Sequence, residues 1–288
     1  MNEQETKVAD RLKTLRTLST VSSSLERVLA AVTDASVNIN EVSQTISRDP
    51  VLAARVLRLA NSSYFSATGN VATLSQAIML IGLREVAMLV ATTSIASNFA
   101  IQTGALHRSE LWLHSCAVAE AARLVASAAD VHPGQAHIAG LLHDLGKVAL
   151  EEAFPSRYRD VVQKSRRQNV PLVLVEREVL GVDHAWAGAF LFERWRLPSA
   201  VVEAVSTHHR GRPTHSALAN TVLLANQLAD YVGLCDPSGA ILDDTEPAPD
   251  LCSALGLSVT IAKDIAGNLE LRRQAIEILH RESLSQAA

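Results

Sequence analysis

Residues 139–147 read Ala-Gly-Leu-Leu-His-Asp-Leu-Gly-Lys and place a histidine next to an aspartate inside an aliphatic run. Burying His143 beside Asp144 costs free energy unless another group pairs with them. A divalent metal ion would pair with both, since imidazole nitrogens and carboxylate oxygens are its usual ligands. The run therefore predicts a metal site, provided that the rest of the chain supplies further ligands.

Helical periodicity extends from this run over nearly the whole chain. Apolar residues recur at helical spacing, as at Leu25, Val28, Leu29 and Val32, and we find no convincing run of strict alternation. We expect helices at residues 51–59, 72–80, 84–99, 109–127, 134–151, 156–168, 172–180, 184–195, 198–209, 216–232 and 258–281, with Pro or Gly at most of the breaks. The pattern predicts an all-α fold.

The helical segments divide into regions of different character. A seam lies near residues 101–108, and the segment 235–250, with three prolines and four aspartates, is typical of a linker. We expect a tail at 1–14, an N-terminal helical subdomain at 15–105, a second helical subdomain at 106–235, and a linker with a C-terminal helical extension at 236–288.

Composition excludes several classes of function. A net charge of −4 argues against a general electrostatic hold on nucleic acid. The charged N-terminus lacks the apolar core of a secretory signal, and the longest apolar stretch, near residues 86–96, is too short to span a bilayer. Cys116, Cys235 and Cys252 lack CxxC spacing, which is typical of reduced thiols. We expect a cytoplasmic protein that contacts neither nucleic acid nor membrane.

Candidate metal ligands gather in the second half of the chain. Glu110 and His114 are four residues apart, so that a helix places them on one face. The full set lies on five predicted helices and comprises Glu110, His114, His143, Asp144, His184, His208, His209 and Asp230. These are more ligands than one metal ion uses. Two metal ions that share a bridging carboxylate would use nearly all of them, and Asp144 is the natural bridge.

The chemistry that such a site supports is phosphoester hydrolysis. Two neighbouring metal ions can hold a phosphate, generate hydroxide and stabilise the leaving oxygen. If the protein is active, Asp144 and Lys147 are the candidate catalytic residues, because Lys147 could reach a phosphate oxygen as a point charge. Fe or Mn suits mixed His and carboxylate ligands at least as well as Zn or Ni.

Each residue also has a purely structural interpretation. A single histidine is usually a surface or satisfied core residue, and we interpret His107, His132, His137, His215 and His280 in this way. Glu110 could be a solvated helix residue, Asp230 could cap a loop, and Lys147 could complement a helix C-terminus. His208 and His209 point about 100° apart on a helix, so one of them could be exposed.

The order His114, His143-Asp144, Asp230 resembles the HD superfamily of metal-dependent phosphohydrolases, whose signature is H…HD…D. Further motifs resemble the HDOD group, namely the sequences at 49–52, 56–62, 77–82, 111–115, 140–147, 181–185, 195–198 and 208–209. The resemblance covers roughly residues 15–235. It implies an N-terminal helical bundle packed on an HD-like bundle, followed by the C-terminal extension.

The resemblance also implies a function. HDOD proteins are generally regarded as bacterial signalling or regulatory output modules, and many have lost metal ligands, whereas this chain retains the set. We therefore expect a signal-transduction protein that acts through conformation and contacts with other signalling proteins, in which a homodimer would fit.

The retained ligand set leaves open whether the chain is an enzyme. The alternative function is an active di-metal phosphohydrolase or phosphodiesterase on a nucleotide or cyclic dinucleotide. His184, His208, His209, Glu110 and Lys147 also match the related HD-GYP phosphodiesterases. After His209, however, the chain reads Arg-Gly-Arg-Pro instead of that group's longer segment ending in Gly-Tyr-Pro.

Overall fold

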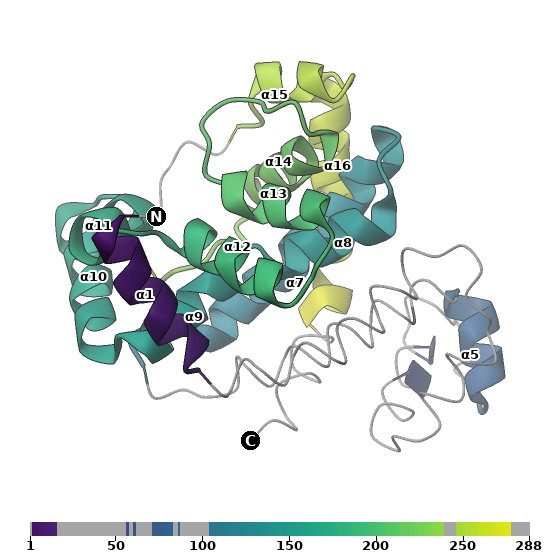
Figure 1. The fold of residues 1–288 in the computed structure, drawn as a ribbon. Helices are drawn as coiled ribbons and strands as arrows, with labels where there is room; N and C mark the ends of the chain where they lie inside the picture. Colours follow the sequence, from purple (N-terminus) through teal and green to yellow (C-terminus); the bar gives the residue numbers. More distant parts are fainter. Residues whose placement is uncertain are drawn as a thin grey trace.

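The computed structural model describes residues 2–15, 56–57, 60–61, 71–82, 86, 104–238 and 246–277. Over these ranges the chain forms helices and no strand, which confirms the all-α prediction (Figure 1). The helices are α1 Glu3–Lys13, α5 Leu74–Ile81, α7 Arg108–Ala128, α8 Pro133–Leu142, α9 Leu145–Ala153, α10 Pro155–Gln168, α11 Leu172–Leu180, α12 His184–Arg194, α13 Ser199–Thr207, α14 Ala217–Tyr231, α15 Pro249–Ala254 and α16 Val259–Leu271. The helices expected around 25–32, at 51–59 and over 84–99 fall wholly or mostly outside the described residues.

The long helix α7 forms the centre of the second subdomain. It packs along α8 and α14, while α12 lies against α9 and α13 (Figure 1). Trp112 and Leu111 of α7 are fully buried, as are Val118 and Ala122 further along the helix. Because α7 is apolar on several sides, neighbouring helices can surround it, and burial of these side chains stabilises the bundle. The helix α5 lies at the opposite end of the molecule from α10 and α11.

The single helix predicted at 134–151 is wrong, because the chain breaks at His143-Asp144 into α8 and α9. The glycines on either side of the pair show the reason. A Cβ on Gly140 would lie 2.9 Å from the carbonyl oxygen of Val118 in α7, and a Cβ on Gly146 would lie 1.9 Å from that of His184 in α12. The two halves therefore pack closely against different partners, and the break projects His143 and Asp144 between them.

The segment at 1–14, expected as a tail, contains helix α1. Asn2 and Glu5 form a capping box at its start, and Val8 and Leu12 are buried. The helix packs on α9 and α12, and the Nε of Arg11 donates a hydrogen bond of 3.2 Å to the carbonyl of Ala153. Its short amphipathic pattern gains stability from this tertiary contact.

The region expected as a linker is partly structured. Residues 235–238 lie against the second subdomain, and α15 already begins at Pro249. The helix α16 packs on α7 and α14 and buries Ile265 and Leu269, whereas Ile261 is exposed. The helix α16 stops at Leu271, ten residues before the predicted end at 281. A further helical turn covers 273–277. The proposed domain boundaries themselves stay predictions.

Two expectations about the chain's surroundings can be compared with the structure. All three cysteines are free thiols, and Cys116 and Cys252 are buried. Within the described ranges, none of the helices has the length and apolar character needed to cross a bilayer.

Candidate metal centre

The carboxylate of Asp144 lies at the centre of a ring of histidines. Its Oδ2 is 3.2 Å from the Nε2 of His143 and 3.9 Å from the Nε2 of His114. Its Oδ1 is 3.3 Å from the Nε2 of His184 and 3.5 Å from the Nε2 of His208. These histidines come from the second turn of α7, the end of α8, the start of α12 and the end of α13. The same nitrogen of each of the four rings therefore faces one buried carboxylate.

Backbone carbonyls fix the orientation of three of these rings. Their Nδ1 contacts are His114 to Leu234 O at 2.7 Å, His143 to Gly140 O at 2.7 Å and His208 to Val205 O at 2.6 Å. Since a carbonyl only accepts, each Nδ1 must carry the hydrogen and donate it. In a neutral ring the Nε2 is then left with a free lone pair, which is the arrangement of a metal-binding histidine.

A carboxylate orients the fourth ring. The Oε2 of Glu176 lies 2.5 Å from the Nδ1 of His184, and its Oε1 accepts a 2.5 Å hydrogen bond from the hydroxyl of Tyr158. Glu176 is fully buried. Burial acts to lower the pKa of His184, but the charge of Glu176 outweighs it and raises that pKa to about 9. A metal ion would therefore compete with a proton for this ring.

The sequence reasoning missed Glu176, although a signal was available. Leu172, Glu176 and Leu180 are spaced by four residues on the buried face of α11. A glutamate at an apolar position of a helix needs a buried partner. His184 supplies it, because Gly181, with φ of 78°, ends α11 and the Asp183 side chain caps α12 by accepting from the backbone N–H of Trp186.

The donor set fits a metal ion. Among the described residues, the Nε2 atoms of His143 and His208 and the Oδ1 of Asp144 are buried without a hydrogen-bond partner, which is costly. Ligand atoms within 4.8 Å of one another form two groups, which are Asp144, His184, His208, His209 and His114, His143, Asp144. Asp144 belongs to both. The cluster can therefore hold a divalent metal ion.

The protonation states of His143 and His208 suit metal binding. Burial lowers the pKa of His143 to about 4 and lowers that of His208, so both rings are neutral at pH 7. Burial opposes ionisation of Asp144, but His143 and Lys147 hold its pKa well below the usual range. Neutral imidazoles around a carboxylate are the forms that coordinate metals.

The structure brings together six of the eight predicted ligands. His208 is buried and His209 is exposed, and both follow the end of α13 at Thr207 instead of lying on it, yet the Nε2 of His209 still lies 2.6 Å from the Nε2 of His184. Asp230 is outside both groups, with its Oδ1 3.9 Å from the Nδ1 of His114. Glu110 is also outside them, and its side chain is exposed. It lies in the first turn of α7, where a negative charge favours the helix dipole.

Lys147 contacts two carboxylates and is itself buried. Its Nζ lies 2.6 Å from the Oδ2 of Asp144 and 3.1 Å from the Oδ2 of Asp236. Burial acts to raise the pKa of Asp236, but the charge of Lys147 lowers it. Asp236 was not predicted, since it lies in the stretch that resembles a linker. The charge of Lys147 is thus neutralised within the protein.

The segment 234–238 covers one side of the centre. Besides the His114 and Lys147 contacts, the hydroxyl of Ser238 accepts a hydrogen bond of 3.3 Å from the backbone N–H of His107. The carbonyl of Pro237 accepts one of 2.9 Å from Arg166 in α10. Contacts from the α7, α9 and α10 regions therefore fix this segment in place.

The HDOD domain family matches residues 18–211, which is more than half of the chain and includes most of the ligands. The chain belongs to the HDOD family. This confirms the resemblance drawn from the motifs.

Similar proteins agree with membership of the HDOD family. An HDOD domain protein of unknown function from Geobacter sulfurreducens is 28% identical, with a TM-score of 0.77 over 90% of this chain and 91% of that chain. A candidate phosphohydrolase from Shewanella amazonensis SB2B is 23% identical, with a TM-score of 0.68 over 99% of this chain and 98% of that chain, which shows the shared fold alone.

One protein that matches by sequence is longer than this chain. An uncharacterised protein of Treponema pallidum (strain Nichols) is 27% identical over 230 residues, covering 78% of this chain and 44% of that protein. This HDOD chain therefore spans less than half the length of the curated relative that it matches.

Proposed function

We propose that this HDOD protein is a bacterial signal-transduction module whose HD-type centre binds one or two divalent metal ions. The observation that carries the proposal is the convergence of four oriented Nε2 atoms on the buried Asp144. The ligands would be His114, His143, Asp144, His184, His208 and His209, with Asp144 bridging if two ions bind. Fe or Mn is favoured, and Zn or Ni would also suit the donors.

The surroundings of Lys147 favour regulation over catalysis. A lysine that receives a phosphate must have its ammonium group available. Here Asp144 and Asp236 already neutralise Lys147, and the side chain is only 8% exposed. The segment 234–238 blocks one approach to the centre. The protein would then act through conformation and contacts with other signalling proteins, or with a second copy of itself, in the cytoplasm.

One observation favours the alternative of an active phosphohydrolase or phosphodiesterase. The two ligand groups share Asp144, as bridging carboxylates do in two-metal hydrolytic sites. When bound, such metal ions lower the pKa of a coordinated water and neutralise phosphate charge. Nucleotides or cyclic dinucleotides would then be the substrates, with Asp144 and Lys147 as the residues nearest the chemistry.

A metal analysis combined with a hydrolysis assay tests the proposal. The purified chain is analysed for bound metals by mass spectrometry and assayed with bis-p-nitrophenyl phosphate and cyclic dinucleotides, beside Asp144→Asn and the exposed control His215→Ala. We expect metal in the wild type and in His215→Ala, none in Asp144→Asn, and no turnover. Chelation should lower the melting temperature, because a metal at about 100 times its Kd stabilises by about 2.7 kcal/mol.

Two results would contradict this function. Turnover that is present in the wild type and lost in Asp144→Asn would establish the hydrolase instead. A wild-type protein that binds none of the four metals after incubation would remove the metal centre itself.

A further inference from the structure

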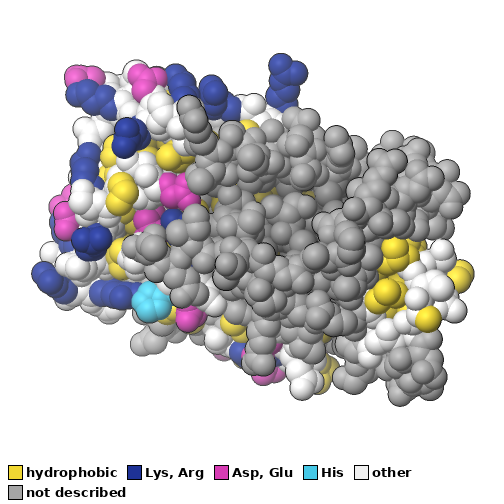
Figure 2. All heavy atoms as spheres, turned by 90° about the horizontal axis from the view of Figure 1, so that it is seen from below, with side chains coloured by type: hydrophobic (Ala, Val, Ile, Leu, Met, Phe, Trp, Pro, Cys, Tyr) yellow, Lys and Arg dark blue, Asp and Glu magenta, His cyan; other side chains and the backbone are white. Residues whose placement is uncertain are grey.

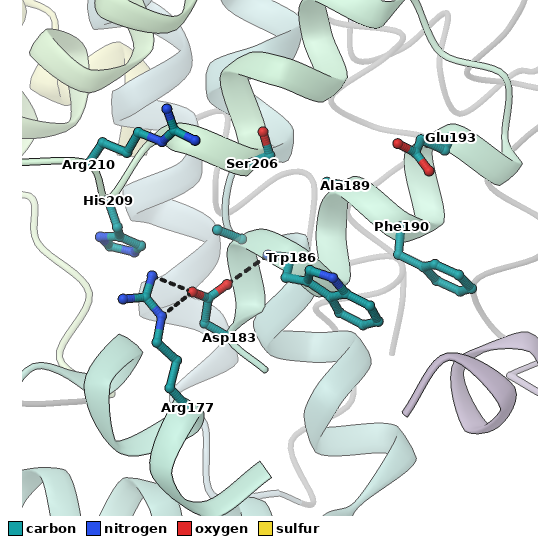
Figure 3. A pocket seen from close by; sticks show the side chains of 10 residues that line it. Arg177, Asp183, Trp186, Ala189, Phe190, Glu193, Ser206, His209 and Arg210 are labelled. Atoms are coloured by element: carbon teal, nitrogen blue, oxygen red, sulfur yellow. Dashed lines mark hydrogen bonds and ion pairs between the residues drawn. The ribbon is translucent and has the colours of Figure 1, made fainter. Parts of the chain in front are cut away.

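A pocket of about 480 Å³ opens beside the metal centre, between α11, α12 and α13 (Figure 3). Its size falls within the range of about 300–1,000 Å³ typical of small-molecule sites. Ala185 and Ala189 of α12 line it, and their small side chains leave the space open. His209 belongs both to the lining of this pocket and to the metal-ligand group of Asp144.

One end of the pocket is cationic. Arg177 and Arg210 approach it on either side of His209 (Figure 3). The Nε and one Nη of Arg177 lie 2.6 Å and 2.5 Å from the Oδ2 of Asp183, so one carboxylate neutralises one of the two guanidinium groups. The side chain of Arg210 is exposed and makes no hydrogen bond or ion pair within the described part of the chain. The excess positive charge, with guanidinium geometry, suits a phosphate group.

The wall of the pocket is aromatic. The rings of Trp186 and Phe190 are stacked, with centroids 5.5 Å apart and an interplanar angle of 8°. Both residues are half-buried, so part of the aromatic surface remains available to a ligand. A planar base stacks favourably on such side chains. This wall therefore favours a ligand that carries an aromatic ring.

The far end of the pocket carries a hydrogen-bond acceptor. Glu193 lines the pocket at the opposite end from His209 and Arg177 (Figure 3). A carboxylate there accepts hydrogen bonds from hydroxyl or amino groups. The pocket thus presents, in order, a cationic end, an aromatic wall and an acceptor.

We propose that this pocket binds a nucleoside monophosphate, with its phosphate between Arg177 and Arg210 and its base against Trp186. This inference rests on the regulatory function proposed above and names its small-molecule signal. Because His209 contacts both the ligand pocket and His184, whose Nε2 is 2.6 Å away, nucleotide and metal should change each other's affinity by the same factor.

A titration with four nucleoside monophosphates tests the inference. AMP, GMP, CMP and UMP are titrated separately into the 288-residue chain by calorimetry and by tryptophan fluorescence. Trp112 and Trp195 are buried, so quenching would report mainly on Trp186. Adenosine and ribose 5-phosphate, each lacking half of the proposed ligand, serve as fragment controls. We expect at least one nucleotide to bind about tenfold or more tightly than either fragment.

Substitutions of pocket residues test whether the nucleotide binds there. Arg210→Ala should weaken nucleotide binding about tenfold or more, through loss of a charge-assisted contact. Arg212→Ala is the matched control, since Arg212 is also exposed but does not line the pocket. Trp186→Leu should weaken nucleotide binding measured by calorimetry, and Ala189→Leu should block binding by filling the space. Circular dichroism checks that each variant is folded.

The outcomes separate this inference from the proposed function. Absence of nucleotide binding, or equal affinity in Arg210→Ala and Arg212→Ala, would overturn the pocket assignment even when metal is bound. Chromatography shows whether the bound nucleotide is hydrolysed. Hydrolysis would be consistent with the pocket assignment and would contradict the regulatory function instead.

Discussion

Lys147 and Asp236 form a buried ion pair of 3.1 Å that joins α9 to the segment 234–238. The same ammonium group lies 2.6 Å from Asp144, the central carboxylate of the candidate metal centre. A contact from outside the His-Asp run at 139–147 therefore holds the lysine of that run in place. On the face shown in Figure 2, Lys and Arg side chains are spread among Asp and Glu, so the described surface there is not uniformly basic.

Asp236→Asn should loosen this pair. The amide keeps the size of the side chain but loses its charge, and Lys147 keeps only Asp144 as an anionic partner. We expect a loss of roughly 1–3 kcal/mol in the free energy of unfolding, measured in urea. Asp264→Asn changes an exposed carboxylate on α16 and should have little effect. Equal stability of the two variants would show that the Lys147–Asp236 pair does not stabilise the fold.

Glu176→Gln should weaken metal binding without removing a ligand. Glu176 orients His184 and places a negative charge beside its Nδ1. Loss of such a supporting carboxylate typically lowers metal affinity about 10- to 100-fold. Competition with a chromogenic chelator measures the change. The exposed Glu178→Gln on the same helix is the control, and a Glu176→Gln protein with wild-type metal affinity would contradict the positioning role.

Gly146→Ala should strongly destabilise the protein. The new Cβ would lie 1.9 Å from the carbonyl oxygen of His184, so α9 and α12 must separate. Overpacking of this kind costs about 1–3 kcal/mol or more. Gly267→Ala on α16 is the matched helical control, since its Cβ meets nothing within 4 Å. That control should gain up to about 1 kcal/mol in the free energy of unfolding from helix propensity. Urea denaturation of both variants measures the two changes.

His137 should make the protein less stable in mild acid. Burial lowers its pKa to about 4, while the neighbouring charges of Glu120 and Arg123 oppose one another. The unfolded chain takes up a proton near pH 6.5, whereas the folded chain does not until about pH 4. The contribution of His137 to stability is therefore complete above pH 6.5 and is lost as the pH falls toward 4.

The variant His137→Leu isolates this contribution. Neither ring nitrogen of His137 has a hydrogen-bond partner within the described residues, so the leucine removes no such bond. Between pH 7 and pH 4.5, the free energy of unfolding of the wild type should fall by on the order of 1–3 kcal/mol more than that of the variant. Urea denaturation at both pH values measures the difference. An identical pH dependence in the two proteins would show that His137 is not the group responsible.

Much of the second subdomain could be predicted from local pattern. The helix expected at 172–180 coincides with α11, and those expected at 109–127 and 216–232 differ from α7 and α14 by one residue at each end. Apolar spacing and Pro or Gly breaks are local properties, so they identify helices before any tertiary contact is known. The same holds for the histidines and Asp144, because their residue types already restrict the chemistry.

Contacts between distant segments explain the errors. The break between α8 and α9 depends on close approach to α7 and α12, so helical spacing in 134–151 could not reveal it. Glu110 shares a helix with His114, but the start of α7 leaves its side chain exposed. Asp236 follows a pattern typical of linkers and becomes part of the centre only through Lys147.

The sequence by itself determined that the chain is helical, that it belongs among HDOD proteins, and that eight of its residues are candidate metal ligands, because these properties depend on residue type and local spacing. Only the tertiary structure decided which atoms face one another. The carbonyl that orients His114 belongs to Leu234, which is 120 residues away in the chain. The direction of a histidine nitrogen depends on such long-range partners, since its hydrogen must be donated to an acceptor that folding brings near.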